Sequence, residues 1–256
     1  MLLNNGANVN HANSDGDTAL ILAAVNNKSD IVQVLLNNGA NVNHANSDGD
    51  TALMSATQRR NIDIVQLLLN NGANVDHANI HGDTALIKGP SSLFAKNKLE
   101  EGEDQSEEEN KVLYIMQLLL NTGQIDINHT ASDGFSALMV SAHGGHENIV
   151  RLLLYYGANV NYDDNYFGNS ALEIAAEKGY NDIVELLLFV PEMDVNGQNI
   201  QNMTALALAA EKGYNYIVDQ LMKTERIKLW NATKAINKAI DKGHQETAEL
   251  IQSYLY

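Results

Sequence analysis

Residues 49–76 read GDTALMSATQRRNIDIVQLLLNNGANVD, and the same pattern recurs along the chain. The pentapeptide Gly-Asp-Thr-Ala-Leu stands at 16–20, 49–53 and 82–86, in two steps of 33 residues. Variants of it occupy 134–138, 168–172 and 202–206, and a degenerate copy begins at Lys234. Because a fixed period of this length is the signature of a stacked repeat architecture, the repeat decides the fold.

Each repeat predicts two helices followed by an extended segment. An Ile-Val-x-x-Leu-Leu block places four apolar side chains on one helical stripe, as at Ile64, Val65, Leu68 and Leu69. A glycine that favours left-handed φ then ends this helix, and a threonine hydroxyl can cap the helix before it. The stop glycines are Gly39, Gly72 and Gly157, and the capping threonines are Thr18, Thr51 and Thr84. One such unit cannot bury its stripe alone, so we expect the units to stack.

This pattern, G-x-T-A-L-x-x-A-A-x-x-G-x-x-x-I-V-x-x-L-L-x-x-G-A-N-V-N, resembles the ankyrin repeat. The resemblance covers essentially the whole chain in about seven units, of which the first is incomplete. It implies an all-α repeat solenoid of helix-turn-helix units with β-hairpin fingers, forming one domain over residues 1–256. Two departures predict softer units: the family's T-P-L-H is T-A-L-x here, and the glycine between the helices is replaced by Asn27 and Arg60.

The third unit carries 18 extra residues, which lie within the stretch 88–111. This stretch contains Gly89-Pro90 and an acidic run that begins at Glu100. We interpret it as a solvated mobile loop, within which Leu93-Phe94-Ala95 could stay helical; an acidic arm for a basic partner is the alternative. At the other end, residues 223–256 predict a capping repeat, because Glu246, Glu249 and Gln252 give its last helix a polar side.

Composition limits the classes of function. Lys and Arg number 16 against 32 Asp and Glu, so the net charge of −16 argues against nucleic acid and anionic membranes as partners. The chain has no Cys, which excludes disulfides, thiolate catalysis and Cys-bound zinc. No apolar run approaches the roughly 18–20 residues that cross a bilayer, and we expect no secretory signal. These features favour a cytoplasmic protein, or one delivered to a host cell cytosol.

Repeated polar residues are candidates for chemistry, and each has a structural explanation. Four histidines, His11, His44, His77 and His129, occupy the same finger position. Stacked helices lie about 8–10 Å apart, whereas Zn–N bonds are roughly 2.0–2.1 Å, so we expect these side chains to bond the neighbouring finger instead of a metal. The paired finger acids recur with the repeat, whereas an active site is one asymmetric constellation. No catalytic motif is present, so we expect no enzyme activity and no cofactor.

The family resemblance implies protein binding through the finger tips and the exposed side of each first helix. Early units present mainly carboxylates there and later units present aromatic and apolar side chains, which are typical interface anchors. For Phe135 and Phe167, local packing against neighbouring fingers is the alternative. The candidate positions are Asp15, Asp17, Asp48, Asp50, Arg59, Phe135, His143, Tyr166, Phe167, Ile200 and Met203.

We therefore predict a monomeric, non-catalytic interaction module that binds a partner protein. Its Asn-rich, consensus-poor style resembles arrays of intracellular bacteria and amoebal viruses, which favours a host-directed effector. Two alternatives stay open. The chain is the interaction part of a larger enzyme assembly, or it is a substrate of an asparaginyl hydroxylase of the kind that modifies ankyrin repeats. The preferred context of that enzyme is met at Asn128 and Asn196, although hydrogen bonding within the finger turn is the default explanation of these asparagines.

Overall fold

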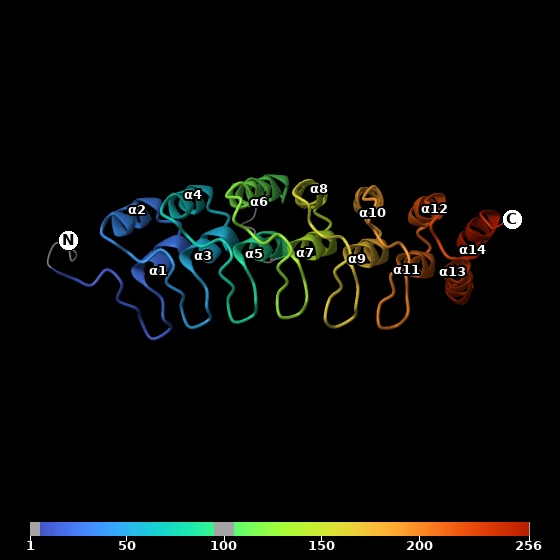
Figure 1. Ribbon diagram of the computed structural model, residues 1–256, viewed down its shortest axis with the longest axis horizontal. Helices are drawn as coiled ribbons and strands as arrows, with labels where there is room; N and C mark the ends of the chain where they lie inside the picture. The colour runs from blue at the N-terminus through green and yellow to red at the C-terminus, as the bar shows by residue number, and fades with distance from the viewer. Residues whose placement is uncertain (1–5, 95–104, 256) are drawn as a thin grey trace. The chain divides into compact units, whose positions relative to one another are not determined.

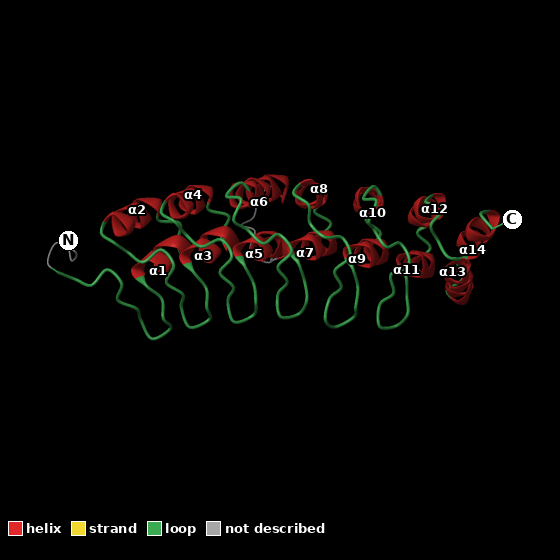
Figure 2. Cartoon of the chain, viewed as in Figure 1, coloured by secondary structure: helices red, strands yellow, loops and turns green. Residues whose placement is uncertain are grey.

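A computed structural model describes residues 6–94 and 105–255. The chain divides into two compact units, Met1–Ser132 and Asp133–Tyr256, which we call unit 1 and unit 2 and describe separately. In both, helices alternate with loops, and the described residues contain isolated β-bridges but no β-strand (Figure 2). No helix in the described ranges is both long and apolar enough to cross a membrane.

Unit 1 is a two-layer stack of short helices. The first helices α1, α3 and α5 pack side by side, and the second helices α2, α4 and α6 form the other layer (Figure 1). Long loops, the predicted fingers, hang from the first helices. The bounds are α1 (Ala19–Val25), α2 (Ser29–Asn37), α3 (Ala52–Gln58), α4 (Ile62–Asn70), α5 (Ala85–Ser91), a 3-10 turn η2 (Ser92–Phe94) and α6 (Gln105–Leu120).

Unit 2 repeats the same arrangement. Its first helices α7, α9, α11 and α13 pack in one row, and its second helices α8, α10, α12 and α14 pack in another. The predicted repeat solenoid is therefore present in each unit. The bounds are α7 (Ala137–Gly144), α8 (Glu147–Tyr155), α9 (Ala171–Lys178), α10 (Asn181–Leu188), α11 (Ala205–Lys212), α12 (Asn215–Lys223), α13 (Leu229–Asp241) and α14 (Gln245–Ser253).

The predicted apolar stripe forms the core. Ile64, Val65 and Leu68 of α4 are fully buried. The hydroxyls of Thr18 and Thr51 accept the predicted capping bonds, but that of Thr84 makes none, so the prediction is wrong there. Burial of each such apolar side chain stabilises the fold by about 1.5–3 kcal/mol. Because the same face is buried in successive repeats, stability accumulates along each unit.

The turns keep the repeat geometry even where glycine is missing. The predicted stop glycines Gly39, Gly72 and Gly157 have φ between 79° and 83°. Asn27 and Arg60 adopt the same left-handed region, with φ of 52° and 59°. A side chain in this region is strained by about 1 kcal/mol or more, so these two turns are made at a cost that glycine would avoid.

The insertion is more helical than predicted. Helix α5 continues through Gly89 and Pro90 to Ser91, η2 covers 92–94, and α6 begins at Gln105, so the prediction of a loop over 88–111 is wrong at both ends. Ala95 and residues 96–104, including the start of the acidic run, lie outside the described residues. The end of that run belongs to α6 instead, where Glu107 and Glu108 suit the positive end of the helix dipole.

The last helix pair matches the predicted capping repeat in one respect. Glu246, Glu249 and Gln252 are all exposed on α14, opposite its buried residues Ala248 and Ile251. The connection before this pair differs from the others, because only residues 224–228 separate α12 from α13.

Candidate protein-interaction surface

Asparagine side chains close the fingers of unit 1. Their Oδ1 atoms accept backbone N–H groups two and four residues further on, at 2.8–3.1 Å, and we call Asn13, Asn46 and Asn79 the tip asparagines. Glycines with φ near 78° follow them, as at Gly49. A Cβ on Gly49 would lie 2.9 Å from the Cα of the next tip asparagine, so only glycine permits the fingers to stack this closely.

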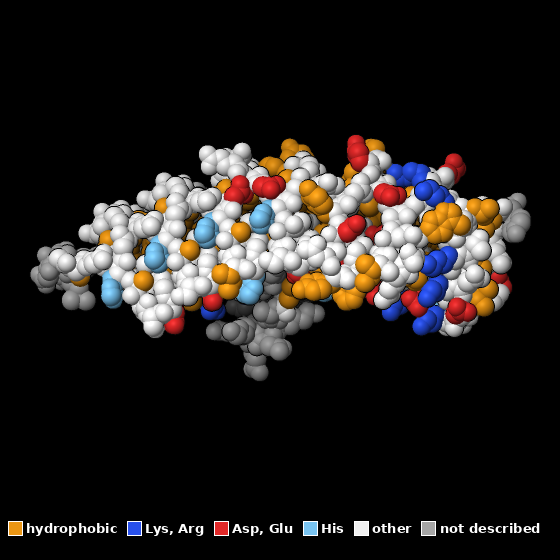
Figure 3. All heavy atoms as spheres, turned by 60° about the horizontal axis from the view of Figure 1, so that its bottom comes forward, with side chains coloured by type: hydrophobic (Ala, Val, Ile, Leu, Met, Phe, Trp, Pro, Cys, Tyr) orange, Lys and Arg blue, Asp and Glu red, His pale blue; other side chains and the backbone are white. Residues whose placement is uncertain are grey.

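Three of the four histidines predicted to join neighbouring fingers do so, whereas His11 is exposed. The Nε2 atoms of His44, His77 and His129 lie 2.9, 2.9 and 2.8 Å from carbonyl oxygens of the preceding finger. A carbonyl can only accept, so each Nε2 carries the proton and donates. The pale blue histidine side chains in Figure 3 follow one another along this part of the surface. Within the described residues no group of three or more His, Asp or Glu is placed to hold a metal ion.

Of the four predicted carboxylates of the unit 1 fingers, only Asp15 and Asp48 are exposed. The tip asparagine of the next finger donates to Asp17 at 2.8 Å and to Asp50 at 2.9 Å, and Lys88 also pairs with Asp50 at 3.1 Å. The finger stack therefore uses both half-buried carboxylates, and a role of Asp17 and Asp50 in binding a partner stays a prediction. Asp15 and Asp48 are exposed, and their backbone carbonyls bond the next finger.

Arg59 is exposed at the end of α3, beside a hollow of about 430 Å³. The neighbouring Arg60 turns towards the insertion instead. Its Nη1 donates to the Ser92 carbonyl at 3.0 Å, and its guanidinium pairs with Glu108 of α6. Lys111 donates to the same carboxylate at 2.5 Å. Arg60 therefore joins the two described ends of the insertion to the turn between α3 and α4.

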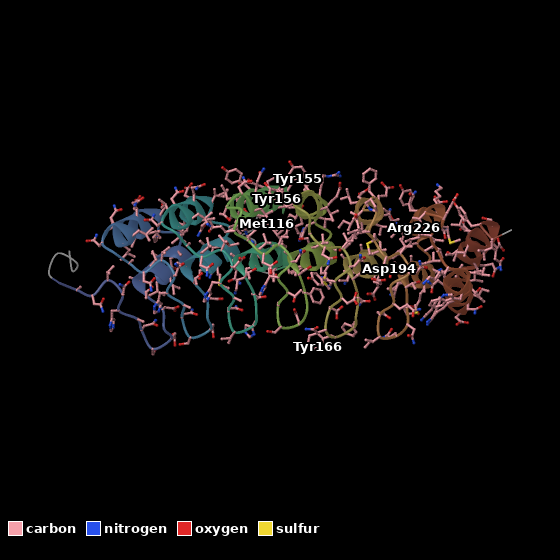
Figure 4. The ribbon with its side chains drawn as sticks, in the orientation of Figure 1. Met116, Tyr155, Tyr156, Tyr166, Asp194 and Arg226 are labelled. Carbon is pink, nitrogen blue, oxygen red and sulfur yellow. The ribbon has the colours of Figure 1, made fainter. Side chains whose placement is uncertain are left out.

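In unit 2 a buried carboxylate shapes the finger that carries the predicted aromatics. Asp164 is 4% exposed and accepts the backbone N–H groups of Tyr166 and Phe167 at 2.8 and 2.5 Å, and that of Asn169 at 3.0 Å. These bonds fix the tip while the two aromatic side chains point outward, 67% and 56% exposed. Tyr166 lies at the free end of its finger in Figure 4.

The next finger extends this aromatic surface. The backbone N–H of Ile200 donates to the Phe167 carbonyl at 2.8 Å, and the Ile200 side chain is 69% exposed. Three large apolar side chains therefore stand on two hydrogen-bonded fingers. We call Tyr166, Phe167 and Ile200 the aromatic tip surface.

Three other predicted binding residues of unit 2 lie outside this surface. The Phe135 ring is half-buried and lies edge-on to His143 of α7, with ring centroids 6.4 Å apart, so it packs locally. His143 is exposed, but partial loss of solvent around the ring lowers its pKa, and nearby Lys178 lowers it further against the opposing Glu177. Met203 is 2% exposed, so the prediction that it anchors a partner is wrong: its backbone closes the finger and its side chain joins the core.

The candidate hydroxylation sites lie at the finger bases. The Asn196 amide donates to the Arg226 carbonyl at 2.9 Å, and its oxygen accepts from the Lys228 N–H and from Asn231, at 2.9 and 2.8 Å. Asn128 is half-buried, and its N–H donates to Asp126. The structural explanation thus holds for Asn196, whose side chain joins one repeat to the next; hydroxylation at either residue stays a prediction.

Sequence reasoning missed several buried or half-buried charged residues. Asp164 could have been found by aligning its finger with the tip asparagines, whose turn-closing role it takes. For Arg60 the repeat pattern shows only that it replaces a glycine. Glu173 of α9 is 2% exposed; one oxygen accepts from the backbone and hydroxyl of Ser170, and Oε1 has no hydrogen-bond partner. Burial raises the pKa of Glu173, and no sequence pattern announces that burial.

Comparison with known proteins identifies the repeat. A family model described as ankyrin repeats (3 copies) matches residues 1–87 and 107–199. Ankyrin repeat domain-containing protein 29 of Danio rerio and that of Homo sapiens are each 43% identical over 49 residues. That stretch is 19% of this chain and 16% of each relative, so the chain spans only a small part of these proteins. Helices α11 to α14 continue the same packing beyond the matched residues. The chain belongs to the ankyrin repeat family.

Proposed function

We propose that this protein is a non-catalytic module that binds a partner protein through the aromatic tip surface of unit 2. Ankyrin repeats are generally protein-interaction modules. The observation that carries the proposal is the exposure of Tyr166, Phe167 and Ile200, at 67%, 56% and 69%, on two hydrogen-bonded fingers. A few side chains supply most of the binding energy at protein interfaces, and tyrosine is enriched among them.

The finger that carries Tyr166 and Phe167 already has a fixed backbone conformation before a partner binds. Three backbone N–H groups bonded to the buried Asp164 carboxylate hold the tip in one conformation. Association therefore costs less conformational entropy than it would if a loose loop had to be ordered. Aromatic rings add large contact area with few rotatable bonds, which lowers that cost further.

The carboxylates of unit 1 support a second, weaker contact. Asp15 and Asp48 are exposed on neighbouring fingers, and the bonds that they give the finger stack come from their backbone carbonyls. They suit a basic segment of a partner, but exposed ion pairs contribute only about 0–1 kcal/mol each. We therefore assign affinity to the aromatic tip surface, and charge selectivity to these carboxylates.

Affinity capture by the whole chain tests the proposal. We expect wild type to retain a protein from eukaryotic lysate, and the Tyr166→Ser, Phe167→Ser double variant to lose it. Tyr155→Ser is the matched control, because Tyr155 is 84% exposed on α8, in the other helical layer of unit 2. Exposed substitutions should change the free energy of unfolding by no more than about 0.5 kcal/mol.

Three results would count against the assignment. Equal capture by wild type and the double variant would exclude the aromatic tip surface as the binding site. Loss of capture by Tyr155→Ser alone would move the site to the other layer. Unfolding of the double variant would show that the two aromatics are packing residues. A host-directed role is part of the same proposal and requires that the captured protein come from the host.

A further inference from the structure

The last repeat lacks a finger. Sixteen residues, 189–204, separate α10 from α11, whereas five residues, 224–228, separate α12 from α13. In Figure 1 a long loop hangs before α11, and no comparable loop precedes α13. The finger at 196–204 is therefore the last one in unit 2, and the place beside it is not filled by a further finger of the described chain.

That place carries an open backbone acceptor. In each pair of neighbouring fingers, an N–H of the later finger donates to a carbonyl of the earlier one, as Asn165 does to Asp133 at 2.9 Å and Ile200 does to Phe167 at 2.8 Å. Where a finger closes over four residues, as at 79–83 and 199–203, the residue after the donor is the expected next acceptor: Ile80 donates and His81 accepts. The Asp164 finger is one residue longer, so there Asn165 donates and Phe167 accepts. By this rule the acceptor after Ile200 is the carbonyl of Gln201, to which no backbone N–H in the described residues donates.

Helix α13 is extended where the finger is missing. Ala235 occupies the repeat position of Ala205, with which α11 begins, but α13 begins six residues earlier, at Leu229. The extension carries Leu229 and Trp230, which are 67% and 51% exposed. By contrast Ala205, the first residue of α11, is fully buried. The two large apolar side chains are thus exposed at the site where a finger would otherwise lie.

The same region is basic in a strongly acidic chain. Residues 223–242 contain six Lys or Arg and two Asp or Glu, whereas the whole chain has twice as many acidic as basic residues. Figure 3 shows the Lys and Arg side chains gathered near this end of unit 2, next to hydrophobic ones. The basic charge therefore coincides with the exposed apolar side chains.

Two lysines border the last finger. The Lys234 ammonium donates to the Asn202 carbonyl at 2.6 Å, which is the bond that a histidine of the next finger makes in unit 1. The Lys228 N–H donates to Asn196 at the finger base, and the Lys228 side chain is exposed. Trp230 is four residues before Lys234 on α13, so the two side chains share one face of the helix.

We propose that this surface binds an extended acidic peptide segment of a partner protein. We call it the basic end surface and define it as the Gln201 carbonyl with Lys228, Leu229, Trp230 and Lys234. The peptide takes the place of the absent finger: a backbone N–H pairs with the Gln201 carbonyl, carboxylates face the lysines, and one apolar side chain contacts Trp230 and Leu229. The surface is distinct from the aromatic tip surface, so the proposal does not depend on the proposed function.

Trp230 provides a direct test, because it is the only tryptophan of the chain. The whole protein is titrated with a short synthetic peptide rich in Asp and Glu that carries one central Leu, and tryptophan emission is followed. We expect a saturable blue shift as the indole becomes buried, with an affinity that falls as salt is added. Anisotropy of the same peptide, labelled, gives a second readout that does not depend on Trp230.

Charge variants locate the site. Lys228→Glu should weaken peptide binding about tenfold, because it replaces an attractive charge at the surface with a repulsive one. Lys28→Glu is the matched control: Lys28 is an exposed lysine of unit 1, and its reversal changes the net charge equally. Circular dichroism of both variants is expected to match wild type, since neither side chain is buried.

Several outcomes would overturn the proposal. These are no saturable change in emission or anisotropy, an equal response to a basic peptide of the same length, or equal weakening by Lys28→Glu. Tighter binding of a single-stranded oligonucleotide would show that the surface selects polyanions in general. An emission shift that depends on protein concentration without any peptide would show that a second copy of the chain covers Trp230. Loss of peptide binding in the Tyr166→Ser, Phe167→Ser variant would place the peptide on the aromatic tip surface instead.

Discussion

Replacing Arg60 by glycine sets two physical effects against each other. The residue lies in the left-handed region with φ of 59°, at a position where the repeat pattern has glycine. Its side chain donates to the Ser92 carbonyl at 3.0 Å and pairs with Glu108, with side chains only 18% and 7% exposed. Arg60→Gly therefore relieves backbone strain but leaves a nearly buried carboxylate with Lys111 as its remaining cation. We expect the loss to outweigh the relief.

The magnitudes decide the direction. Removing the backbone strain of a non-glycine residue at positive φ stabilises the folded state by about 1 kcal/mol. Removing one partner from a buried ion pair costs about 3–5 kcal/mol, and retention of Lys111 places this case at the lower end. The free energy of unfolding of the α3 to α6 region should therefore fall by about 2 kcal/mol in Arg60→Gly. Arg59→Ala is the control, because Arg59 is exposed at the adjacent position.

Hydrogen exchange read by mass spectrometry measures this change locally, which matters because a repeat array need not unfold in one step. Amides of α5 and α6 should lose protection in Arg60→Gly and keep it in Arg59→Ala. In a Glu108→Gln background the effect of Arg60→Gly should shrink by about 2 kcal/mol, as expected for contacting residues in a double-mutant cycle. Equal or greater protection in Arg60→Gly, or strict additivity with Glu108→Gln, would refute the reasoning.

The same pair predicts a pH dependence. Burial raises the pKa of Glu108, but hydrogen bonds and charges from Lys111 and Arg60 outweigh it and hold the pKa below its ordinary value of 4.5. A lowered carboxyl pKa stabilises the folded state above pH 4.5, and this stability is lost as the pH falls through the lowered value. The difference between wild type and Arg60→Gly should therefore shrink in acid; a constant difference would contradict the ion-pair explanation.

Three further changes test the packing of the repeats. Gly49→Ala should lower Tm more than Gly39→Ala, because both have φ near 80° but only the Gly49 position meets the backbone of the next finger; equal shifts in thermal unfolding would contradict the close approach. His77→Ala should cost about 0.5–1.5 kcal/mol in urea unfolding, and His11→Ala, whose side chain is exposed, should cost less. Glu173→Gln should stabilise the protein at neutral pH, because a carboxyl with a raised pKa favours folding only while it is protonated. This gain in stability should vanish as the pH falls to the ordinary carboxyl range, and a pH-independent effect would count against the explanation.

The helix pairs were predictable because their signals repeat. The stripe of Ile64, Val65 and Leu68 and the stop at Gly72 recur in other units, so each copy supports the others. The finger contacts of His44 were predictable for a related reason: a polar residue at a fixed repeat position, with metal binding excluded by spacing, has the neighbouring finger as its partner.

The insertion and several site residues were not predictable, because their state depends on partners distant in sequence. An acidic run favours solvent on composition alone, yet Glu108 is buried since Arg60, 48 residues earlier, reaches it. The sequence predicts Asp17 as a partner-binding residue, because it cannot show that the side-chain amide of Asn46, 29 residues later, donates to Asp17. The family resemblance predicts Met203 as a binding residue because it aligns with the finger-tip positions, whereas this finger turns its apolar side chain inward.

Function in such an array is expected where the repeat is interrupted and the interrupting side chain stays exposed. In regular fingers the stack itself uses the carboxylates and histidines, as Asp50 and His77 show, so these residues have little left for a partner. Tyr166 and Trp230 are aromatic residues at positions where the neighbouring units have none, and both side chains are exposed to solvent. Interruption alone is not sufficient, since Met203 also departs from the pattern and is buried. Both proposed surfaces combine departure from the repeat with exposure, and the stacking bonds explain why the regular positions do not.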